Sequence, residues 1–390
     1  MAREFKKTTL KTYKLIAKTF AGLENVLASE IKELGGTNIK TGTRAVYYEG
    51  NLEIIYKSNY FLRTALRILK EIEFFQFKDV DQFYLYCKKI KWDNFFTTEQ
   101  NFVVNSTVSN SRDFRNSMFA SLKVKDALVD YFREKTGKRP SVDTQNPEIF
   151  INVHINKNSC TIALDSSGES LHKRGYRVIQ GEAPLNEVLA AGMILLSGWK
   201  GSSDFVDPMC GSGTLPVEAA FIAQNIPAGK FRKTYAFQHW LDYKEDLFES
   251  VQQSATKKDF VYKIYASDVS GSSLLNAQTN ARRALVFNKI EFKVADFKDL
   301  QLDLSENAVI IINPPYGERL QATNLEVLYA MMGERLKHQF TGSTAWILSA
   351  ATASMKHIAL KPSKKLRLYN GSLECNYNMY RTFSGKLSQQ

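Results

Sequence analysis

The sequence predicts an α/β protein in two parts: an α+β region up to about residue 165, then a mostly parallel, doubly wound sheet. Three observations lead to this prediction. The chain has 390 residues, more than one typical core accommodates. Apolar residues make up 44% of it, enough to bury a substantial core. The pattern changes near residue 166. Before it, short strands and helices form an α+β pattern, and after it short apolar strands alternate regularly with helices.

The elements expected before residue 166 follow from periodicity and turn residues. A helix is predicted over residues 21–34, where Leu23, Leu27 and Ile31 recur at helical spacing before a Gly-Gly pair. Further along, we predict a strand over 45–50, a helix around 60–70, a strand over 102–109 and a helix near 119–134. Strands 149–156 and 160–165 should form a hairpin around residues 156–158.

The elements expected after residue 175 alternate regularly. Helices are predicted over 186–199, 215–223 and 272–285, and strands over 204–207, 261–268, 290–296, 308–315 and 344–350. Ligands of such sheets bind beyond the carboxyl ends of the strands. The residues with recognisable chemistry fall at those positions.

Composition limits the kind of partner. The net charge is +12, with 26 basic and 19 acidic residues up to residue 165, and 26 and 21 after it. A basic chain favours polyanionic partners, although the charge can also serve solubility alone. The four cysteines form no C-x-x-C pair, so we expect reduced thiols and no metal site. No long apolar run or secretory signal is visible, so we expect a cytoplasmic protein without membrane contact.

The first motif, DPMCGSGT, spans residues 207–214 between a predicted strand and helix. Glycines here allow a tight turn and close approach of a ligand, and the helix N-terminus can receive an anion. Pro216 stands where a dinucleotide motif has its third glycine, and no phosphate-loop lysine follows. A structural turn is the alternative. The candidate ligand-binding residues are Asp207, Pro208, Cys210, Gly211, Gly213 and Thr214.

Two acidic residues end the next two predicted strands. Asp268 can accept both hydroxyls of a ribose, and the alternative is a cap for the following helix. Asp296 can accept a hydrogen bond from an adenine amino group, with Phe297 packed against the base. The alternative for Asp296 is a solvated loop acid.

The most specific motif is Asn313-Pro314-Pro315-Tyr316, at the end of the strand over 308–315. Two consecutive prolines remove two N–H donors and stiffen the chain. The Asn313 side-chain oxygen and the Pro314 carbonyl can then accept hydrogen bonds from an NH₂ group on a base. Tyr316 offers a flat ring for stacking.

With these motifs, residues 204–350 resemble class I S-adenosylmethionine-dependent methyltransferases that act on amino groups. Four further segments, LHKRGYR (171–177), GEAPL (181–185), PAGKFRKTYAFQHW (227–240) and NPPYGERL (313–320), narrow the resemblance. The chain is similar to the bacterial THUMP-domain methyltransferases that modify guanine N2 in 23S ribosomal RNA. Such proteins are also described as N6-adenine DNA methylases.

The resemblance implies a Rossmann-like methyltransferase domain with a mostly parallel sheet, preceded by an α+β ferredoxin-like and THUMP module that binds RNA. The implied divisions are residues 1–70 for the ferredoxin-like segment, 71–165 for the THUMP domain and 166–390 for the methyltransferase domain. A fragment covering 166–390 should then bind the cofactor by itself.

The resemblance also implies residue roles. The cofactor is S-adenosyl-L-methionine: residues 207–214 hold its methionine end, Asp268 the ribose, and Asp296 with Phe297 the adenine, while the turn at 185–187 covers it. The catalytic residues are Asn313, Pro314, Pro315 and Tyr316. The candidate RNA contacts are Arg133, Lys135, Lys138, Arg139, Lys173 and Arg174. A solvated surface is the alternative for each of these basic residues.

The expected activity is methyl transfer to guanine N2 in 23S rRNA or in a large-subunit assembly intermediate, without a metal. Three alternatives stay open: an N6-adenine methyltransferase on RNA or DNA, a tRNA guanine-N2 methyltransferase, and an inactive RNA-binding assembly factor. The sequence does not indicate the target nucleotide or the oligomeric state.

Overall fold

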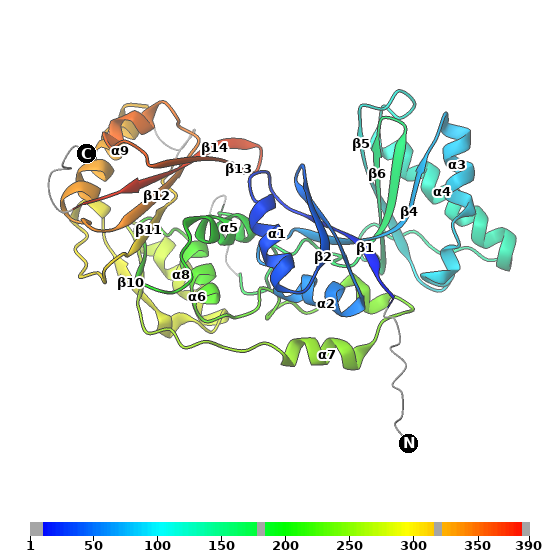
Figure 1. The fold of residues 1–390 in the computed structure, drawn as a ribbon, viewed down its shortest axis with the longest axis horizontal. Helices are drawn as coiled ribbons and strands as arrows, with labels where there is room; N and C mark the ends of the chain where they lie inside the picture. The colour runs from blue at the N-terminus through cyan, green and yellow to red at the C-terminus, as the bar shows by residue number, and fades with distance from the viewer. Residues whose placement is uncertain (1–10, 178–183, 316–321, 384–390) are drawn as a thin grey trace, which may run out of the picture.

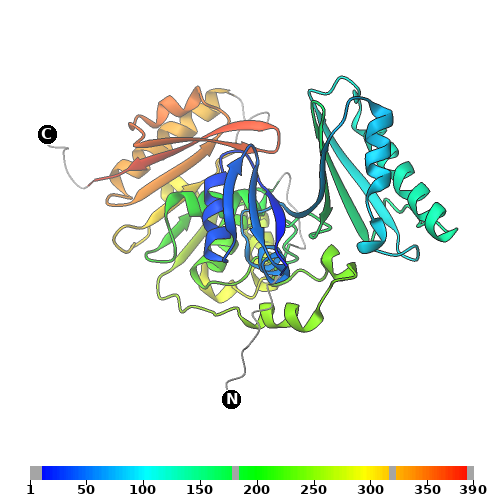
Figure 2. The ribbon, with the colours of Figure 1, turned by 45° about the vertical axis from the view of Figure 1, so that its right-hand side comes forward.

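The computed structural model describes residues 11–177, 184–315 and 322–383. These residues form two seven-stranded sheets, one on either side of residue 166 (Figure 1). Figure 2 shows β5, β6, α3 and α4 standing away from the rest of the molecule as a separate lobe. The predicted α/β fold in two parts is confirmed. Within the described ranges, no helix is long and apolar enough to cross a membrane.

The first sheet runs β2-β3-β1-β4-β7-β6-β5. Its middle strand, β4, pairs with β1 through residues 67–70 and with β7 through residues 69–76, so it crosses the expected boundary at residue 70. The elements of this region are β1 (Tyr13–Lys18), α1 (Glu24–Glu33), β2 (Thr37–Gly42), β3 (Ala45–Gly50), α2 (Leu52–Phe61), β4 (Arg67–Gln76), α3 (Val80–Lys89), η1 (Trp92–Asn94), β5 (Phe102–Ser109), α4 (Ser117–Thr136), β6 (Ile149–Asn156) and β7 (Ser159–Asp165).

The helix predicted around residues 60–70 is wrong. Helix α2 starts after Asn51, whose side chain accepts a hydrogen bond from the Ile54 N–H, and it ends at Phe61. Strand β4 begins at Arg67, and Ile68 and Leu69 are both buried. The apolar spacing there suits either structure. Hydrogen bonding to β1 on one side and β7 on the other decides for a strand.

The second sheet runs β10-β9-β8-β11-β12-β14-β13. The five strands from β10 to β12 are parallel. Strand β14 is antiparallel to β12, and β13, its hairpin partner at the edge of the sheet, runs in the same direction as the five. The elements of this second region, in which η marks a short 3-10 helix, are α5 (Glu187–Ser197), β8 (Phe205–Asp207), α6 (Thr214–Ala223), η2 (Ala236–His239), α7 (Glu245–Gln253), β9 (Ile264–Asp268), α8 (Gly271–Arg283), η3 (Phe287–Lys289), β10 (Ile290–Val294), η4 (Phe297–Asp299), β11 (Val309–Ile312), α9 (Ala322–His338), β12 (Thr344–Ser349), η6 (Ser354–Ile358), β13 (Lys364–Asn370) and β14 (Leu373–Arg381).

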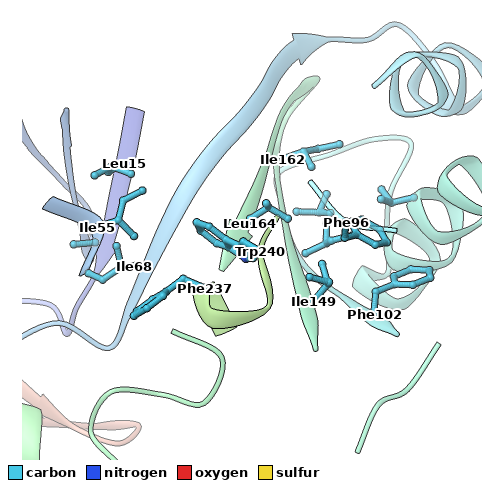
Figure 3. Close-up of a cluster of buried hydrophobic side chains, with 14 of the residues drawn as sticks. Leu15, Ile55, Ile68, Phe96, Phe102, Ile149, Ile162, Leu164, Phe237 and Trp240 are labelled. Atoms are coloured by element: carbon cyan, nitrogen blue, oxygen red, sulfur yellow. The ribbon is translucent and has the colours of Figure 1, made fainter. Parts of the chain in front are cut away.

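The segment of residues 227–240, called the insert below, leaves the second sheet and packs against the first. Phe237 stacks on Tyr56 of α2 with ring centroids 4.5 Å apart, and both rings are fully buried. Figure 3 shows Phe237 and Trp240 beside side chains of the first sheet. The Lys70 ammonium lies 4.3 Å from the centre of the Trp240 ring and 2.9 Å from Asp242. Residues of both parts therefore share one hydrophobic core.

Candidate functional site

The candidate residues gather at one edge of the second sheet. Strands β8, β9, β10 and β11 are parallel neighbours, so their carboxyl ends lie at the same edge. Asp207 ends β8, Asp268 ends β9, Asp296 follows β10 and Asn313 follows β11. The fold thus brings together four side chains spread over about a hundred residues of sequence.

The loop over residues 207–214, called the cofactor loop below, is held against β9. The Cys210 N–H donates to the Ser267 carbonyl at 2.9 Å, and the Gly211 N–H donates to the Asp268 carboxylate at 2.9 Å. The Gly213 N–H turns back to the Cys210 carbonyl at 2.8 Å. Cys210 itself is buried. These bonds place the loop directly before α6, whose first residue is Thr214.

The two glycines of the loop differ in the space around them. Both have positive φ, +51° at Gly211 and +83° at Gly213. A Cβ on Gly211 would point into open space, whereas a Cβ on Gly213 would lie 2.8 Å from the Cβ of Ala277 in α8. We expected both to admit a ligand. Only Gly211 has free space beside it, and the close approach at Gly213 is to α8.

The carboxyl group of Asp207 is buried, with 1% of the residue exposed. Burial raises its pKa well above the usual range, and the nearby Asp268 raises it further. The Met209 N–H, which donates to it at 3.3 Å, acts in the opposite direction. Asp207 is therefore held where a negative charge is disfavoured.

Asp268 accepts two backbone hydrogen bonds, from Gly211 on one oxygen and from Ser270 on the other, each at 2.9 Å. The N-cap of α8 is Ser270, whose hydroxyl accepts from the Ser273 N–H. The alternative interpretation of Asp268 as the helix cap is therefore wrong. Each carboxylate oxygen keeps a lone pair for a further donor.

Asp296 and Phe297 differ in environment. Asp296 caps the short helix η4 and pairs with Lys298 at 3.3 Å. The Phe297 ring is only 2% exposed and stacks on Phe340 with centroids 5.5 Å apart. Its hydrophobic neighbours cover this ring, which does not fit the expectation that it packs against adenine. Burial of a single aromatic residue next to a polar one cannot be read from local sequence.

Asn313 follows the central strand β11, and its side chain is half-buried. The Oδ1 atom is buried and has no hydrogen-bond partner among the residues that the structure describes. Pro314 and Pro315 follow, and neither has an N–H that could reach it. A buried acceptor without a donor is energetically costly. Tyr316 lies outside the described residues.

Most of the predicted RNA contacts are on the surface. Arg133, Lys138 and Arg139 are exposed and line one shallow hollow at the end of α4, so the fold brings them together. Lys135 pairs with Asp93 at 2.6 Å, and Lys173 pairs with Glu169 at 2.7 Å. All five remain accessible to a partner.

Arg174 is not a surface residue, and its assignment as an RNA contact is wrong. Only 2% of its side chain is exposed. The guanidinium donates to the carbonyls of Leu171, at 2.9 Å, and Arg63, and lies 3.5 Å from Glu218 of α6. It therefore joins the N-terminal region to the helix that follows the cofactor loop.

The site also contains Arg177, for which the sequence predicted no binding role. Arg177, the last residue of the LHKRGYR segment, contacts the cofactor loop through Thr214 at 2.7 Å. Its partner Glu187, 2.7 Å away, opens α5. The turn at 185–187 was expected to cover the cofactor; in the structure Asn186 caps α5. The signal available in the sequence was an arginine that ends the LHKRGYR segment, followed ten residues later by a glutamate in the turn at 185–187.

Family models account for most of the chain. A model described as the RMKL-like methyltransferase domain matches residues 174–379. A THUMP domain model matches residues 77–165, and a model of the RlmL ferredoxin-like domain matches residues 14–69. The chain therefore carries a THUMP domain between a ferredoxin-like segment and a methyltransferase domain.

Similar proteins carry related names. A protein of Synechocystis sp., named as a candidate RNA methyltransferase, is 36% identical over 383 residues, which cover 97% of this chain and 98% of that protein. The ribosomal RNA large subunit methyltransferase K/L of Psychromonas ingrahamii is 38% identical over 371 residues, which cover 93% of this chain but 49% of that protein. The chain spans about half the length of the K/L relatives that it matches.

Solved structures agree with this assignment. SMU.472, described as a candidate methyltransferase and crystallised with SAH, superposes with a TM-score of 0.87 at 32% identity, covering 96% of this chain and all of that one. A Listeria monocytogenes protein described as a predicted N6-adenine-specific DNA methylase gives 0.86 at 30% identity, covering 95% and 97%. The predicted family and methyltransferase class are confirmed: the chain belongs to the RMKL-like methyltransferases that carry a THUMP and a ferredoxin-like domain.

Proposed function

We propose that this chain transfers a methyl group from S-adenosyl-L-methionine to the exocyclic N2 amine of a guanine in 23S rRNA. The observation that carries the proposal is the buried Asn313 Oδ1, which has no donor among the described residues. It follows the central strand of the sheet and precedes two prolines. An amino group on a flipped base is the donor that such an acceptor lacks.

The residues at the sheet edge fit the cofactor. Open space beside Gly211 leaves room for a ligand at the cofactor loop. The α6 N-terminus suits the methionine carboxylate, Asp268 suits the ribose hydroxyls and Asp296 suits the adenine amine. When bound, the cofactor supplies an activated methyl group on a sulfonium sulfur. The chain's own task is to align the nucleophile with it.

Asn313 and Pro314 act on that nucleophile. The lone pair of an exocyclic amine is delocalised into the base, so the amine attacks poorly. Hydrogen bonds from the NH₂ group to Asn313 Oδ1 and the Pro314 carbonyl orient the amine and strengthen as positive charge develops on nitrogen. The positively charged product loses its proton readily, so no base is needed before attack. Tyr316 stacks on the target base in this proposal.

The choice of substrate rests on the family. The THUMP domain and the basic hollow at Arg133, Lys138 and Arg139 support an RNA partner. The names of the K/L relatives favour large-subunit rRNA, free or within an assembly intermediate. The name of the Listeria structure favours an N6-adenine methylase, the second candidate, since an Asn-Pro-Pro-Tyr loop accepts either amino group. A tRNA substrate requires the same chemistry.

A comparison of nucleosides tests the substrate. Ribosomal RNA and tRNA from wild-type and deletion strains are digested and compared by mass spectrometry. We expect loss of N2-methylguanosine from large-subunit rRNA, restored by the wild-type gene. Loss of N6-methyladenosine would replace the proposed base, and loss of N2-methylguanosine from tRNA alone would replace the proposed RNA. Unchanged nucleosides would support the inactive assembly factor.

Asn313→Ala tests the catalytic assignment. Turnover should fall about 10²–10³-fold, as when an oriented polar contact at a reacting centre is lost. Cofactor affinity, measured by calorimetry, should stay within a few-fold, because Asn313 contacts the acceptor. The control is Asn378→Ala on β14, another asparagine with a buried Oδ1 that has no partner within the described ranges. Wild-type turnover in the Asn313 variant would reject this assignment.

A further inference from the structure

Arg177 connects two segments that border the candidate cofactor site. Its guanidinium donates to the Ser212 hydroxyl at 3.2 Å and to the Thr214 hydroxyl at 2.7 Å, both in the cofactor loop. It also donates to the Leu185 carbonyl at 3.2 Å and to the Glu187 carboxylate at 2.7 Å, at the start of α5. One side chain therefore bridges the cofactor loop and α5.

The contacts engage all three nitrogens of the guanidinium. Nε bonds Glu187, Nη1 bonds Ser212, and Nη2 bonds both Leu185 and Thr214. Arg177 and Glu187 have side chains that are only 10% and 7% exposed, so solvent screens their ion pair weakly. A lysine has a single nitrogen and cannot reproduce this fork.

The cofactor loop is held differently on its other sides. Asp268 accepts from the Gly211 N–H, and the Asn280 side chain of α8 donates to the Ser212 carbonyl at 3.1 Å. These contacts hold the backbone of the loop. Arg177 instead binds the side-chain hydroxyls at its end, next to the first N–H groups of α6. Those N–H groups are where a carboxylate of the cofactor would bind.

We propose that Arg177 is a positioning residue for the amino-acid end of the cofactor, acting through Ser212 and Thr214. The inference rests on the proposed cofactor. With Glu187 as its counter-ion, Arg177 orients the end of the loop and the first turn of α6 toward the methionine carboxylate. The adenosine half, assigned to Asp268 and Asp296, lies outside its contacts.

Two ligands separate this role from general support of the fold. S-adenosylhomocysteine has the amino-acid part, whereas 5′-methylthioadenosine keeps the adenosine and the sulfur but lacks it. By calorimetry, Arg177→Met should bind S-adenosylhomocysteine about tenfold or more weakly. The variant loses the charge-assisted hydrogen bonds to Ser212 and Thr214 that, in this proposal, orient the end of the cofactor loop toward the carboxylate of the ligand. Its affinity for methylthioadenosine should stay within about twofold of wild type. Asp268→Ala should weaken both ligands.

Arg174→Met is the matched control, because Arg174 is also buried in the same segment but directs its hydrogen bonds to Leu171, Arg63 and Glu218, outside the cofactor loop. It should lower stability without discriminating between the ligands. Equal weakening of both ligands by Arg177→Met, or unchanged affinity for S-adenosylhomocysteine, would overturn the inference. Failure of the wild-type chain to bind either ligand would instead reject the proposed cofactor.

Thr214 provides a second test that does not require Arg177 to be replaced. Thr214→Val removes one of the four acceptors of Arg177, the Thr214 hydroxyl, with little change of shape, and Thr214→Ser keeps this hydroxyl. We expect several-fold weaker binding of S-adenosylhomocysteine for the valine variant and near wild-type binding for the serine variant. Combined with Arg177→Met, Thr214→Val should add little, as for two changes that remove one interaction. Full additivity would contradict the proposed coupling.

Discussion

Asp207 shows at the residue scale how burial changes the chemistry of a motif. The same carboxyl group at the surface would be ionised at neutral pH. Here burial and the neighbouring Asp268 raise its pKa well above the usual range. Local sequence places an acid at this strand end, but its surroundings decide which form is stable.

The stability of the protein should depend on pH through Asp207. A folded pKa above the unfolded value of about 3.9 means that the folded state binds the extra proton above this pH. Stability from this group is fully present below that value and is lost as pH rises through the folded pKa. Asp207→Asn is neutral at every pH. As pH rises through this window, the free energy of unfolding of wild type should therefore fall relative to that of the variant. Denaturant unfolding of the ligand-free protein at a series of pH values measures this.

The exposed Asp259 offers a control, since Asp259→Asn leaves the buried carboxyl group unchanged. Its stability curve should run parallel to that of wild type. Parallel curves for Asp207→Asn as well would show that Asp207 has the same pKa in the folded and unfolded chain.

At the element scale, the contact between the cofactor loop and α8 explains the second glycine of the motif. Gly213 and Gly198 have the same φ of +83°, and each is the residue next to a helix end. A Cβ on Gly198 would meet nothing within 4 Å, whereas on Gly213 it would lie 2.8 Å from Ala277. Both positions therefore require a residue that tolerates positive φ, but only position 213 also requires the absence of a Cβ, because α8 packs against it.

Gly213→Ala should therefore destabilise the protein more than Gly198→Ala. Both variants face the cost of a left-handed residue, roughly 1–2 kcal/mol. Gly213→Ala adds an overpacking cost of about 1–3 kcal/mol, because α8 must move. Thermal or denaturant unfolding of the two variants measures the difference. Equal losses would show that α8 yields without cost.

For the whole molecule, the insert makes the two parts depend on each other. Tyr235, Phe237 and Trp240 belong to the second part of the sequence but to the hydrophobic core of the first. Leu23, from the N-terminal region, packs in the opposite direction, against the core of the methyltransferase domain. The predicted autonomy of residues 166–390 does not fit this exchange.

Phe237→Ala should cost about 3–5 kcal/mol, as for other buried aromatic residues. The matched control is Leu241→Ala, one residue beyond the insert, where the side chain is 53% exposed and the loss should be small. A fragment of residues 166–390 should lack a cooperative unfolding transition, because its insert and α7 lose their partners. Cooperative unfolding of that fragment with wild-type cofactor affinity would show that the domain is autonomous after all.

The sequence by itself determined the fold class, the parallel strands from β8 to β12 and the positions of the cofactor loop and Asn313, because these depend on local periodicity and on residues at strand ends. Tertiary structure alone decided that residues 67–70 form a strand and that Lys173 is exposed while Arg174 is buried. The carbonyl of Arg63 that Arg174 binds lies 111 residues away in the sequence. The environment of a side chain depends on such distant partners. Because they leave no mark in the local periodicity, the sequence near a residue does not show whether its side chain is buried.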